Sequence, residues 1–536
     1  MKKVMRILLF CAAAVVTFAF SRTPAATVVH HDCDVQWIIQ WRGEGSEGYS
    51  TTLRQWEFTC AFKAEVAEYW NSDSSLIHGN MPLDDYLENI EFDFRDALKY
   101  QGPVFHPDTI QNQAGAMEGG EPIPREQIFA YESGVQTVIV NLPRSSPELV
   151  CKIFQYTIER CSLVRNGFLV VARGNSYEQL AVRALDYGSF NDMMKGGSNE
   201  DATWSIRLRR YGPEESVNNG DRKKRPNRQA RYGKNVRSPL SDEKKAILAM
   251  KDLVKLFPGK VNLSNPDCKI YLFDGLKRAD SESCDSTKCL ARSIGKGPKT
   301  SVYAPKTRIC VTTTPLCPIA AFALCNVARL RPHFMVLDPF AGSCASLLAA
   351  SHIAKHSARG TKSQGGTVSI EFAHNGLVNR DDIVLDFETR SLDPPLKIIH
   401  GDCMLYETRK IARQAIGGGA FDCIVTDPPY GIREAMISSS WESCNSDGKI
   451  GGRSSIPPLT QLFYAMGRDR AIGEPLLKVG GRLVAFIPVR KGETLDECLP
   501  ELQAREEAGL VMECEGREQV LNDILSRWLV SFLCVS

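Results

Sequence analysis

The carboxyl-terminal part of the chain alternates short apolar runs with turn residues. Runs of four to six residues rich in apolar side chains lie at 334–337, 366–371, 396–400 and 421–425. They are too short for ordinary helices and are bounded by Gly, Pro or acidic residues, which predicts buried strands of a parallel sheet. After the first run come a turn of small residues and a helical stretch that begins near Cys344. The order strand, tight turn, helix predicts an α/β fold with a doubly wound sheet.

The end of the chain continues this pattern. Residues 476–487 predict a helix end, a Gly-Gly turn and a further strand, and residues 510–514 and 528–533 predict two more strands. We therefore expect a mostly parallel sheet with a terminal hairpin. The segment 435–458 is rich in Ser, Gly and Pro, which predicts a mobile substrate loop.

The amino-terminal half has a different pattern. Residues 35–100 mix apolar and acidic positions as in a small α/β domain, and 101–124 contain Gly and Pro without periodicity, which predicts an insertion. Residues 147–158 have the amphipathic pattern of a helix, with Ser145 or Ser146 as its cap. Strands are predicted at 136–142, 162–171 and 203–208.

Length and composition set the class of protein. The chain has 536 residues, 43% of them hydrophobic and 24% charged, which is ordinary for a soluble protein of several domains. The net charge of +2 means that affinity for nucleic acid must come from local patches. The predicted segments are an extension at 1–33, an α/β domain at 34–124, a domain at 125–275 with a basic insertion at 214–240, a linker at 276–300 and a catalytic domain at 301–536.

One strand ends in the sequence Asp-Pro-Pro-Tyr, which carries the most specific chemistry of the chain. Pro428 and Pro429 remove two backbone donors and fix two φ angles, so the carbonyls of Asp427 and Pro428 are held rigidly. This arrangement suits a planar heterocycle with an exocyclic amine, which would stack on Tyr430 and donate to Asp427 and to a carbonyl. Such acceptors make the nitrogen more nucleophilic toward a methyl donor. We assign Asp427, Pro428, Pro429 and Tyr430 to the catalytic site.

An amine methyltransferase needs S-adenosylmethionine, and the residues after the first three strands predict its site. Gly342 lets the backbone of the turn approach a ligand, and Asp338 can order that turn and meet the methionine end. Glu371, which ends the second strand, can accept from the ribose hydroxyls, and Asp402, after the third, from the adenine amine. The predicted cofactor residues are Asp338, Phe340, Gly342, Glu371 and Asp402.

Several motifs resemble one enzyme family. The Asp-Pro-Pro-Tyr run resembles the signature of methyltransferases that act on exocyclic amines of nucleobases. Its extension at 431–434 is similar to the tRNA guanine-10-N2 methyltransferase family, in particular the eukaryotic catalytic subunit. The glycine turn resembles that family's Asp-Pro-Phe-x-Gly-Thr-Gly motif, but Cys344 replaces the second glycine and narrows the pocket. Residues 257–263 and 265–273 resemble the end of the family's THUMP domain, and 526–529 its closing segment.

The resemblance implies a Rossmann-like S-adenosylmethionine methyltransferase domain preceded by an α/β THUMP-containing RNA-binding half. The implied reaction is methyl transfer to N2 of a guanosine in tRNA, at position 10, and a paired base must be flipped out to react. The implied partners are tRNA and a small zinc-binding activator subunit, without DNA and, in the mature form, without a membrane. The implied location is the cytoplasm. Two alternatives stay open: a DNA adenine or cytosine amino methyltransferase, and a non-catalytic RNA-binding scaffold, which only Cys344 favours.

Three further features have weaker assignments. Residues 1–26 resemble a signal peptide or plastid presequence, too short to span a membrane, so an organelle is the alternative location. The basic run 222–237 has three alternative interpretations: a phosphate-binding segment, a nuclear localisation signal and a solvated insertion. The 18 cysteines include no Cys-x-x-Cys pair, and we predict no metal site and no catalytic cysteine.

Overall fold

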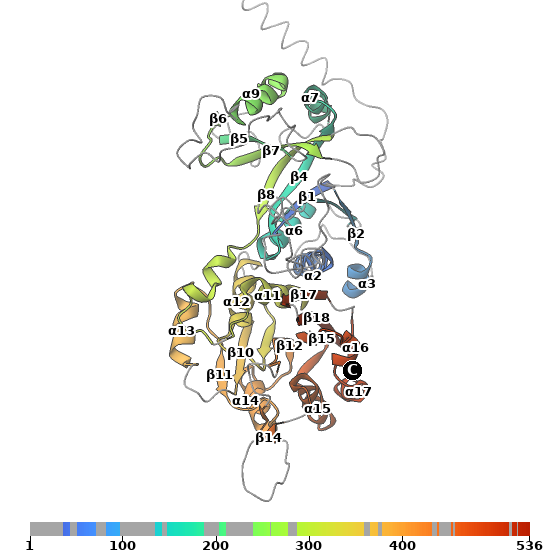
Figure 1. Cartoon of the computed structure of the whole chain (residues 1–536), viewed down its shortest axis with the longest axis vertical. Coiled ribbons are helices and arrows are strands. Elements are labelled where there is room, and N and C mark those ends of the chain that lie inside the picture. Colours follow the sequence, from blue (N-terminus) through green and yellow to red (C-terminus); the bar gives the residue numbers. More distant parts are fainter. Residues whose placement is uncertain are drawn as a thin grey trace, which may run out of the picture. The chain divides into compact units, whose positions relative to one another are not determined.

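The computed structural model describes most of the chain beyond its first residues (Figure 1). The chain divides into two compact units, Met1–Asp34 and Val35–Ser536, and the first lies outside the described residues. The presequence, the predicted insertion at 101–124 and the basic run 222–237 therefore stay predictions. The described residues are 36–42, 51–70, 82–96, 135–141, 147–186, 203–210, 239–257, 259–276, 287–312, 314–357, 365–372, 378–430, 437–438, 452–453, 456–513, 517–522 and 524–536.

Within the described residues, the amino-terminal half contains an eight-stranded mixed sheet in the order β2-β3-β1-β4-β8-β7-β5-β6. The strands are β1 (Gln36–Trp41), β2 (Glu91–Asp96), β3 (Val135–Asn141), β4 (Val164–Gly174), β5 (Thr203–Arg210), β6 (Lys260–Val261), β7 (Cys268–Leu276) and β8 (Thr287–Lys296). The helices are α2 (Thr51–Trp70), α3 (Leu83–Glu88), α6 (Pro147–Arg160), α7 (Tyr177–Asp186), α9 (Pro239–Ala249) and α10 (Lys251–Val254).

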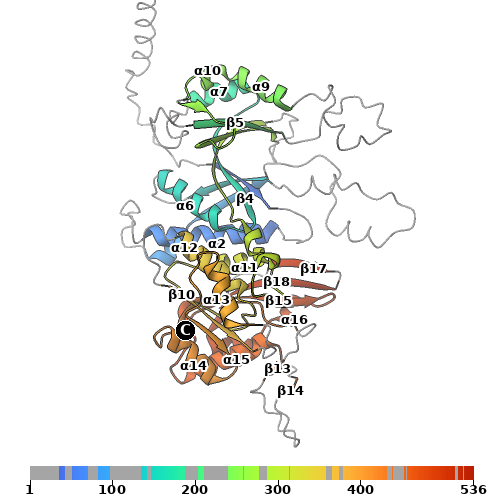
Figure 2. The same cartoon turned by 90° about the vertical axis from the view of Figure 1, so that its left-hand side faces the viewer.

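Two cores support this sheet. An aromatic core joins β1 to α2 and α6, where the rings of Trp37 and Phe154 stack with centroids 4.0 Å apart. A second core lies under α7, α9 and α10, which cover the sheet at β5 (Figure 2). Alternate residues of β5 and β7, among them Ile206 and Ile270, enter that second core because successive side chains of a strand point to opposite faces.

The domain boundaries differ from the predicted ones in two places. The linker predicted at 276–300 is wrong in its second half, because β8 pairs antiparallel with both β4 and β7 in the middle of the sheet. The boundary predicted at residue 125 also does not separate two sheets, since β1 and β2 both pair with β3. In β8 the buried residues Cys289, Leu290 and Ala291 lie between Lys288 and Arg292, and a run this short gives only a weak apolar pattern.

The carboxyl-terminal half contains the predicted mostly parallel sheet, drawn in yellow to red in Figure 1. Its order is β11-β10-β9-β12-β15-β18-β16, and β17 pairs with β18. The strands are β9 (Met335–Asp338), β10 (Gly366–Glu371), β11 (Lys397–His400), β12 (Phe421–Thr426), β15 (Leu477–Arg490), β16 (Leu510–Met512), β17 (Arg517–Asn522) and β18 (Leu525–Cys534). The helices are α11 (Pro318–Val327), α12 (Ala345–Ser357), α13 (Arg380–Glu388), α14 (Tyr406–Ala415), α15 (Pro458–Ala471), α16 (Leu495–Cys498) and α17 (Leu502–Ala508).

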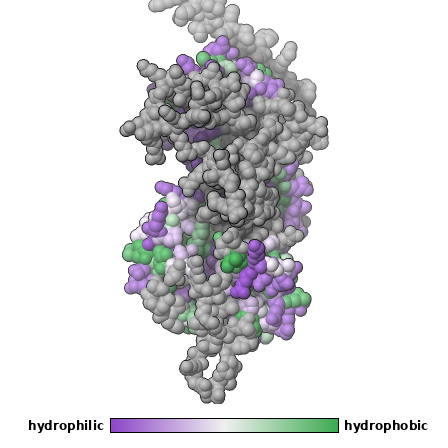
Figure 3. Space-filling view, in the orientation of Figure 1, coloured by the Kyte–Doolittle hydropathy of each residue, from purple (hydrophilic) through white to green (hydrophobic). Residues whose placement is uncertain are grey.

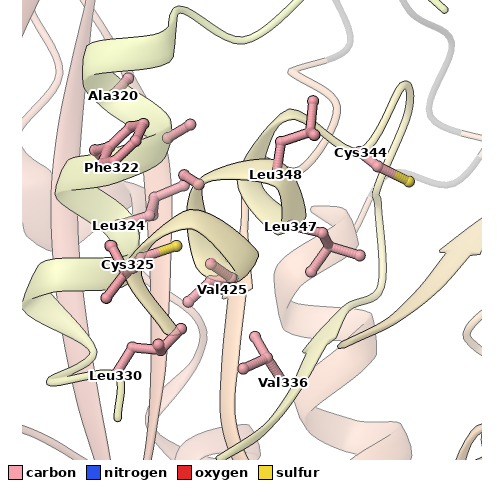
Figure 4. Packing of buried hydrophobic residues seen from close by; sticks show 14 of the residues in the cluster. Ala320, Phe322, Leu324, Cys325, Leu330, Val336, Cys344, Leu347, Leu348 and Val425 are labelled. Atoms are coloured by element: carbon pink, nitrogen blue, oxygen red, sulfur yellow. The ribbon is translucent and has the colours of Figure 1, made fainter. Parts of the chain in front are cut away.

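Alternation along the central strands fills a core on each face of this sheet. Val336 and Val425 pack with α11, α12 and α13 on one face, as Figure 4 shows for part of the cluster. Leu337 and Ile424 pack with α14, α15 and α17 on the other. The α/β fold with a doubly wound sheet and antiparallel β16, β17 and β18 is therefore confirmed.

Two local predictions in this half need correction or addition. The helix end predicted at 476 is wrong, because residues 477–490 form the single strand β15 and the nearest helix ends at Ala471. Gly480 has φ of 80°, and the β12–β15 register shifts nearby, so the glycines deform the strand without ending it. Within the predicted loop 435–458, β13 (Ile437–Ser438) and β14 (Gly452–Arg453) pair as an antiparallel ladder, and most of the loop lies outside the described residues.

A buried polar network connects the two halves. Glu57 of α2, with none of its surface exposed, accepts from the backbone N–H groups of Ser162 (2.8 Å) and Leu163 (2.9 Å) and from Nδ2 of Asn326 (2.8 Å). Arg160 donates to Oδ1 of Asn326 (2.8 Å) and to Glu65 (2.7 Å). Removing one partner from such a network leaves buried polar groups unpaired, which costs several kcal/mol, of order 3–5 for a buried ion pair. The carboxyl-terminal half therefore shares a buried polar network with the amino-terminal half.

No helix among the described residues has the length and apolar character needed to cross a membrane. Nor do they contain a group of three or more His, Cys, Asp or Glu side chains placed to hold a metal ion. On the face shown in Figure 3, hydrophobic residues of the described part lie in separate small groups among hydrophilic ones.

Candidate active site

The predicted site residues lie at one edge of the carboxyl-terminal sheet. The strands β9, β10, β11 and β12 run parallel, so their carboxyl ends meet at the same edge. In the register, Ser369 lies opposite Asp338, and Glu371 lies opposite His400. In doubly wound sheets ligands bind at this edge, outside the carboxyl ends of the strands.

Asp338 ends β9 and holds the turn that follows. Its Oδ1 accepts from the backbone N–H of Phe340 (3.0 Å) and from the hydroxyl of Thr426 (2.8 Å), and its Oδ2 accepts from the hydroxyl of Ser346. The residue is 3% exposed, and burial raises the pKa of its carboxyl group to about 6. Asp338 thus orders the turn as expected, while its contact with a methionine end stays a prediction.

The glycine turn has an unusual backbone that two neighbouring side chains hold. Gly342 has φ of 50° and Cys344 has φ of 61°, both in the left-handed region. The N–H of Gly342 donates to Oε2 of Glu371 at the end of β10 (2.7 Å). On the other side, Arg308 donates to the Ser343 hydroxyl (3.2 Å) and to its carbonyl. The turn is therefore fixed before a ligand arrives, which reduces the ordering that binding requires.

Asp402 repeats the arrangement of Asp338 at the next strand. It follows β11, is 6% exposed, and its Oδ1 accepts from the backbone N–H of Met404 (2.8 Å). Both acids accept from the N–H two residues further along the chain, as in an Asx turn. Phe340 packs against the cluster that contains Met404, so the predicted cofactor residues are brought to one sheet edge. Their roles toward a cofactor remain predictions.

The Asp-Pro-Pro-Tyr run follows β12 beside this turn. Because Pro428 and Pro429 have no N–H, Asp427 cannot form the Asx turn that the other two acids form. Its carboxylate is contacted by side chains instead: the Tyr430 hydroxyl donates to Oδ1, and a guanidinium N–H of Arg527 donates to Oδ2 (3.3 Å). Burial and the adjacent Asp427 raise the pKa of the Tyr430 hydroxyl well above its ordinary value, so it stays a donor. Residues 431–436 lie outside the described part.

Several residues of this site were missed by the sequence patterns. Arg527 lies in the segment 526–529, whose resemblance to the family gave no role, and its contact with Asp427 depends on strand order. Ser346 and Thr426 are ordinary core-facing hydroxyls in sequence, and only the fold places both on Asp338. Burial raises the pKa of the Cys423 thiol well above its ordinary value, so this cysteine beside the motif stays a neutral thiol.

Comparisons with known proteins agree with the family resemblance. No protein-family model matches the chain. The chain is similar to tRNA (guanine(10)-N(2))-methyltransferase TRMT11 of Gallus gallus, with 26% identity over 296 residues that cover 51% of this chain and 59% of that protein. The protein of the same name in Xenopus laevis is 27% identical over 295 residues, covering 51% and 57%. The human protein is 26% identical over 306 residues, covering 51% and 60%.

The chain thus spans less than two thirds of the length of the curated relatives it matches. Among solved structures, TrmN from Thermus thermophilus aligns with 80% of this chain and 96% of its own, at 16% identity and a TM-score of 0.32. The chain is accordingly similar to curated tRNA guanine-N2 methyltransferases in about half of its length.

Proposed function

We propose that this protein transfers a methyl group from S-adenosylmethionine to the exocyclic N2 of a guanosine in tRNA, at position 10. The observation that carries the proposal is the Asp427–Tyr430 run at the end of β12, beside the fixed glycine turn of β9. Sequence similarity to proteins named tRNA (guanine(10)-N(2))-methyltransferase supports the choice of base and RNA.

The residues present fit the cofactor. S-adenosylmethionine supplies a methyl carbon that is made electrophilic by a sulfonium group. Glu371 accepts from Gly342 N–H through one oxygen, and a carboxylate has further acceptor capacity for the ribose hydroxyls. Asp402, which follows the neighbouring strand, is the proposed acceptor of the adenine amine. The turn around Gly342 provides the close approach of backbone that a nucleoside needs.

The chain's residues act on the amine rather than through a covalent intermediate. Asp427 and the Pro428 carbonyl accept hydrogen bonds from the two N2–H groups, and the Tyr430 ring supports the plane of the flipped base. When bound, S-adenosylmethionine would supply its methyl carbon to this nitrogen, and the electron pair of the carbon–sulfur bond would remain on sulfur. The methylated nitrogen then loses one proton to water, which restores a neutral base.

The amino-terminal half is proposed to hold the tRNA as a THUMP-like domain. On the face of β5 and β7 opposite α7, α9 and α10 lie Arg207, Arg209, Lys269 and Tyr271. The guanidinium of Arg209 lies over the Tyr271 ring, 5.7 Å from its centroid. Basic groups beside an aromatic ring bind phosphates and stacked bases.

Point variants test this half better than a truncation, because the buried network around Glu57 joins it to the catalytic half. Arg209→Glu combined with Lys269→Glu should weaken tRNA binding and flatten its salt dependence, with the logarithmic slope falling by roughly 1 per lost phosphate contact. Lys255→Glu is the matched control, since Lys255 is exposed on the helical side and pairs with Asp252 (3.2 Å). Equal losses in both variants would contradict a specific RNA face.

Two aspects of the proposal rest on family resemblance. A small zinc-binding activator subunit is the proposed protein partner. The cytoplasm is the proposed location, with an organelle as the alternative that depends on residues 1–26. Both can be tested by co-purification and by imaging of the full chain.

The deciding experiment is methylation of total tRNA by the purified protein, with and without the activator subunit, followed by nucleoside mass spectrometry. We expect N2-methylguanosine, formed about 100- to 1,000-fold more slowly by Asp427→Ala. Methylated adenine or cytosine in DNA substrates would favour the alternative amino methyltransferase. Failure of the protein to bind S-adenosylmethionine in an equilibrium titration would favour the non-catalytic scaffold.

A further inference from the structure

Arg527 lies at the same sheet edge as the catalytic motif although it comes 100 residues later. The strand β18 runs antiparallel to β15, so its first residues reach the edge where the parallel strands end. Arg527 pairs with Pro488 in the register, and its guanidinium passes over the Phe486 ring, 4.2 Å from the centroid. From there it reaches Oδ2 of Asp427 at 3.3 Å.

The surroundings of Arg527 fix it in place. The residue is only 6% exposed, so its planar group is held between the Phe486 ring and the Asp427 carboxylate. It also hydrogen-bonds the Tyr430 hydroxyl, which itself donates to Oδ1 of Asp427. The three side chains form a closed triangle in which each contacts the other two. Arg527 therefore orients both the acceptor carboxylate and the ring expected to support the base.

The chemistry of the acceptor explains why this matters. An ionised carboxylate only accepts hydrogen bonds, whereas a protonated one also donates. A donating acid would bond to the amine nitrogen through the lone pair that has to attack the methyl carbon. An opposite charge within about 4–6 Å favours the ionised form. Among the described groups that act on Asp427, Arg527 carries positive charge, Tyr430 donates as a neutral hydroxyl, and Asp338 of β9 is a second acid nearby.

We propose that Arg527 is a positioning residue for the methyl transfer, which keeps Asp427 in its ionised, accepting form and holds Tyr430 in the orientation that receives the base. This inference rests on the proposed function, since it assigns Asp427 to the reacting amine. Because the adjacent guanidinium stabilises the ionised form of Asp427, this carboxylate is a weak base, and the proton released after transfer goes to water.

The test compares Arg527→Met and Arg527→Lys with the wild-type protein. In Arg527→Met the acid limb of the pH profile of kcat/KM should move upward by about 1–3 pH units. In Arg527→Lys most of that shift should be absent, because the charge remains, while kcat stays reduced because lysine lacks the planar guanidinium. The affinity for S-adenosylmethionine should stay within a few-fold in both variants, which confirms that the cofactor side is folded.

A matched control distinguishes positioning from a structural role. Arg482→Met removes another largely buried guanidinium of the same sheet, which pairs with Glu513 (2.8 and 2.6 Å) away from the motif. It should lower the Tm without moving the acid limb. If Arg527→Met lowers only the Tm and leaves the acid limb in place, Arg527 is a structural residue and the proposal is wrong.

A measurement without turnover separates this proposal from the proposed function. The carboxyl carbon signal of Asp427 in selectively labelled protein, identified with Asp427→Asn, reports its ionisation directly. The pH midpoint of this signal's titration should be higher in Arg527→Met than in the wild type, and in Arg527→Lys it should lie close to the wild-type value. If the wild-type protein methylates no RNA but this midpoint moves, the proposed reaction fails while the control of Asp427 by Arg527 stands. If the midpoint is unchanged, the inference fails whatever the activity.

Discussion

The cofactor side and the acceptor side of the site hold their carboxylates in different ways. On the cofactor side, Asp338 and Asp402 each accept the backbone N–H two residues later, at 3.0 and 2.8 Å. On the acceptor side, Asp427 precedes two prolines without N–H groups, and the side chains of Tyr430 and Arg527 contact it instead. Asp338 and Asp402 thus fix the backbone of the turns that follow them, whereas Asp427 at the same sheet edge presents its carboxylate to an incoming group.

The largest expected effect follows from the acceptor side. Asp427→Ala should lower the rate of methyl transfer about 100- to 1,000-fold, the usual cost of removing a group that stabilises the transition state. Binding of S-adenosylmethionine should change little, because Asp427 holds no backbone N–H of the cofactor turn. Single-turnover methylation and equilibrium titration measure the two quantities separately.

Asp427→Asn is the matched variant for this prediction. The asparagine keeps one hydrogen-bond-accepting oxygen near the position of a carboxylate oxygen, but it lacks the negative charge that faces Arg527. The rate of methyl transfer should therefore lie between those of the wild type and Asp427→Ala. A rate for Asp427→Ala within a few-fold of the wild type would remove Asp427 from the reaction.

The cofactor side should show its own dependence on pH through stability. Burial raises the pKa of Asp338 to about 6, above the ordinary 3.8, so the folded state binds this proton more tightly than the unfolded state. The free energy of unfolding should therefore fall as pH rises from about 4 to about 6, by at most roughly 3 kcal/mol from this group. Urea unfolding should show that fall in the wild type and a flatter profile in Asp338→Asn. Parallel profiles of the two proteins would assign the titration to another group.

The difference between the two sides also explains what the sequence could predict. Strands β9 to β12 and the acids at their ends were predictable because a short apolar run followed by an acid and small residues is a local pattern. The contact of Arg527 with Asp427 was not, since it depends on β18 returning antiparallel beside β15. The same holds for the network around Glu57 and Asn326, whose residues are 269 positions apart. Long-range polar contacts of this kind leave no periodic signal.

A smaller effect is expected for Glu371, whose replacement should change the affinity for S-adenosylmethionine but not that for tRNA. Glu371→Ala removes the acceptor of the Gly342 N–H (2.7 Å) and the proposed partner of the ribose, so S-adenosylmethionine should bind about 10- to 100-fold more weakly. The affinity for tRNA should not change. Glu371→Gln should lose less affinity for S-adenosylmethionine than Glu371→Ala, because glutamine keeps an accepting oxygen. If Glu371→Ala binds the cofactor normally, the ribose partner lies elsewhere, with Asp381 or Asp382 at the start of α13 as the next candidates.

The smallest expected effect concerns Cys344, where the family pattern has glycine. Its φ of 61° costs a residue with a side chain about 1–2 kcal/mol, which glycine would not incur. Cys344 is, however, only 1% exposed and packs in the hydrophobic cluster around α12. Burial of its side chain stabilises the folded state by an amount similar to the cost of the backbone strain. The two terms oppose each other in Cys344→Gly, so the free energy of unfolding should change by less than about 1 kcal/mol.

The cofactor affinity of Cys344→Gly then decides what the cysteine does. With its thiol buried in the hydrophobic cluster, we expect S-adenosylmethionine to bind within about two-fold of the wild type, since that corresponds to less than roughly 0.5 kcal/mol. Cys344→Ala is the matched control, because it keeps the backbone strain and removes only the sulfur. A tenfold gain in affinity for the glycine variant but not for the alanine variant would mean that the left-handed backbone at Cys344, rather than its thiol, limits how the turn receives the cofactor.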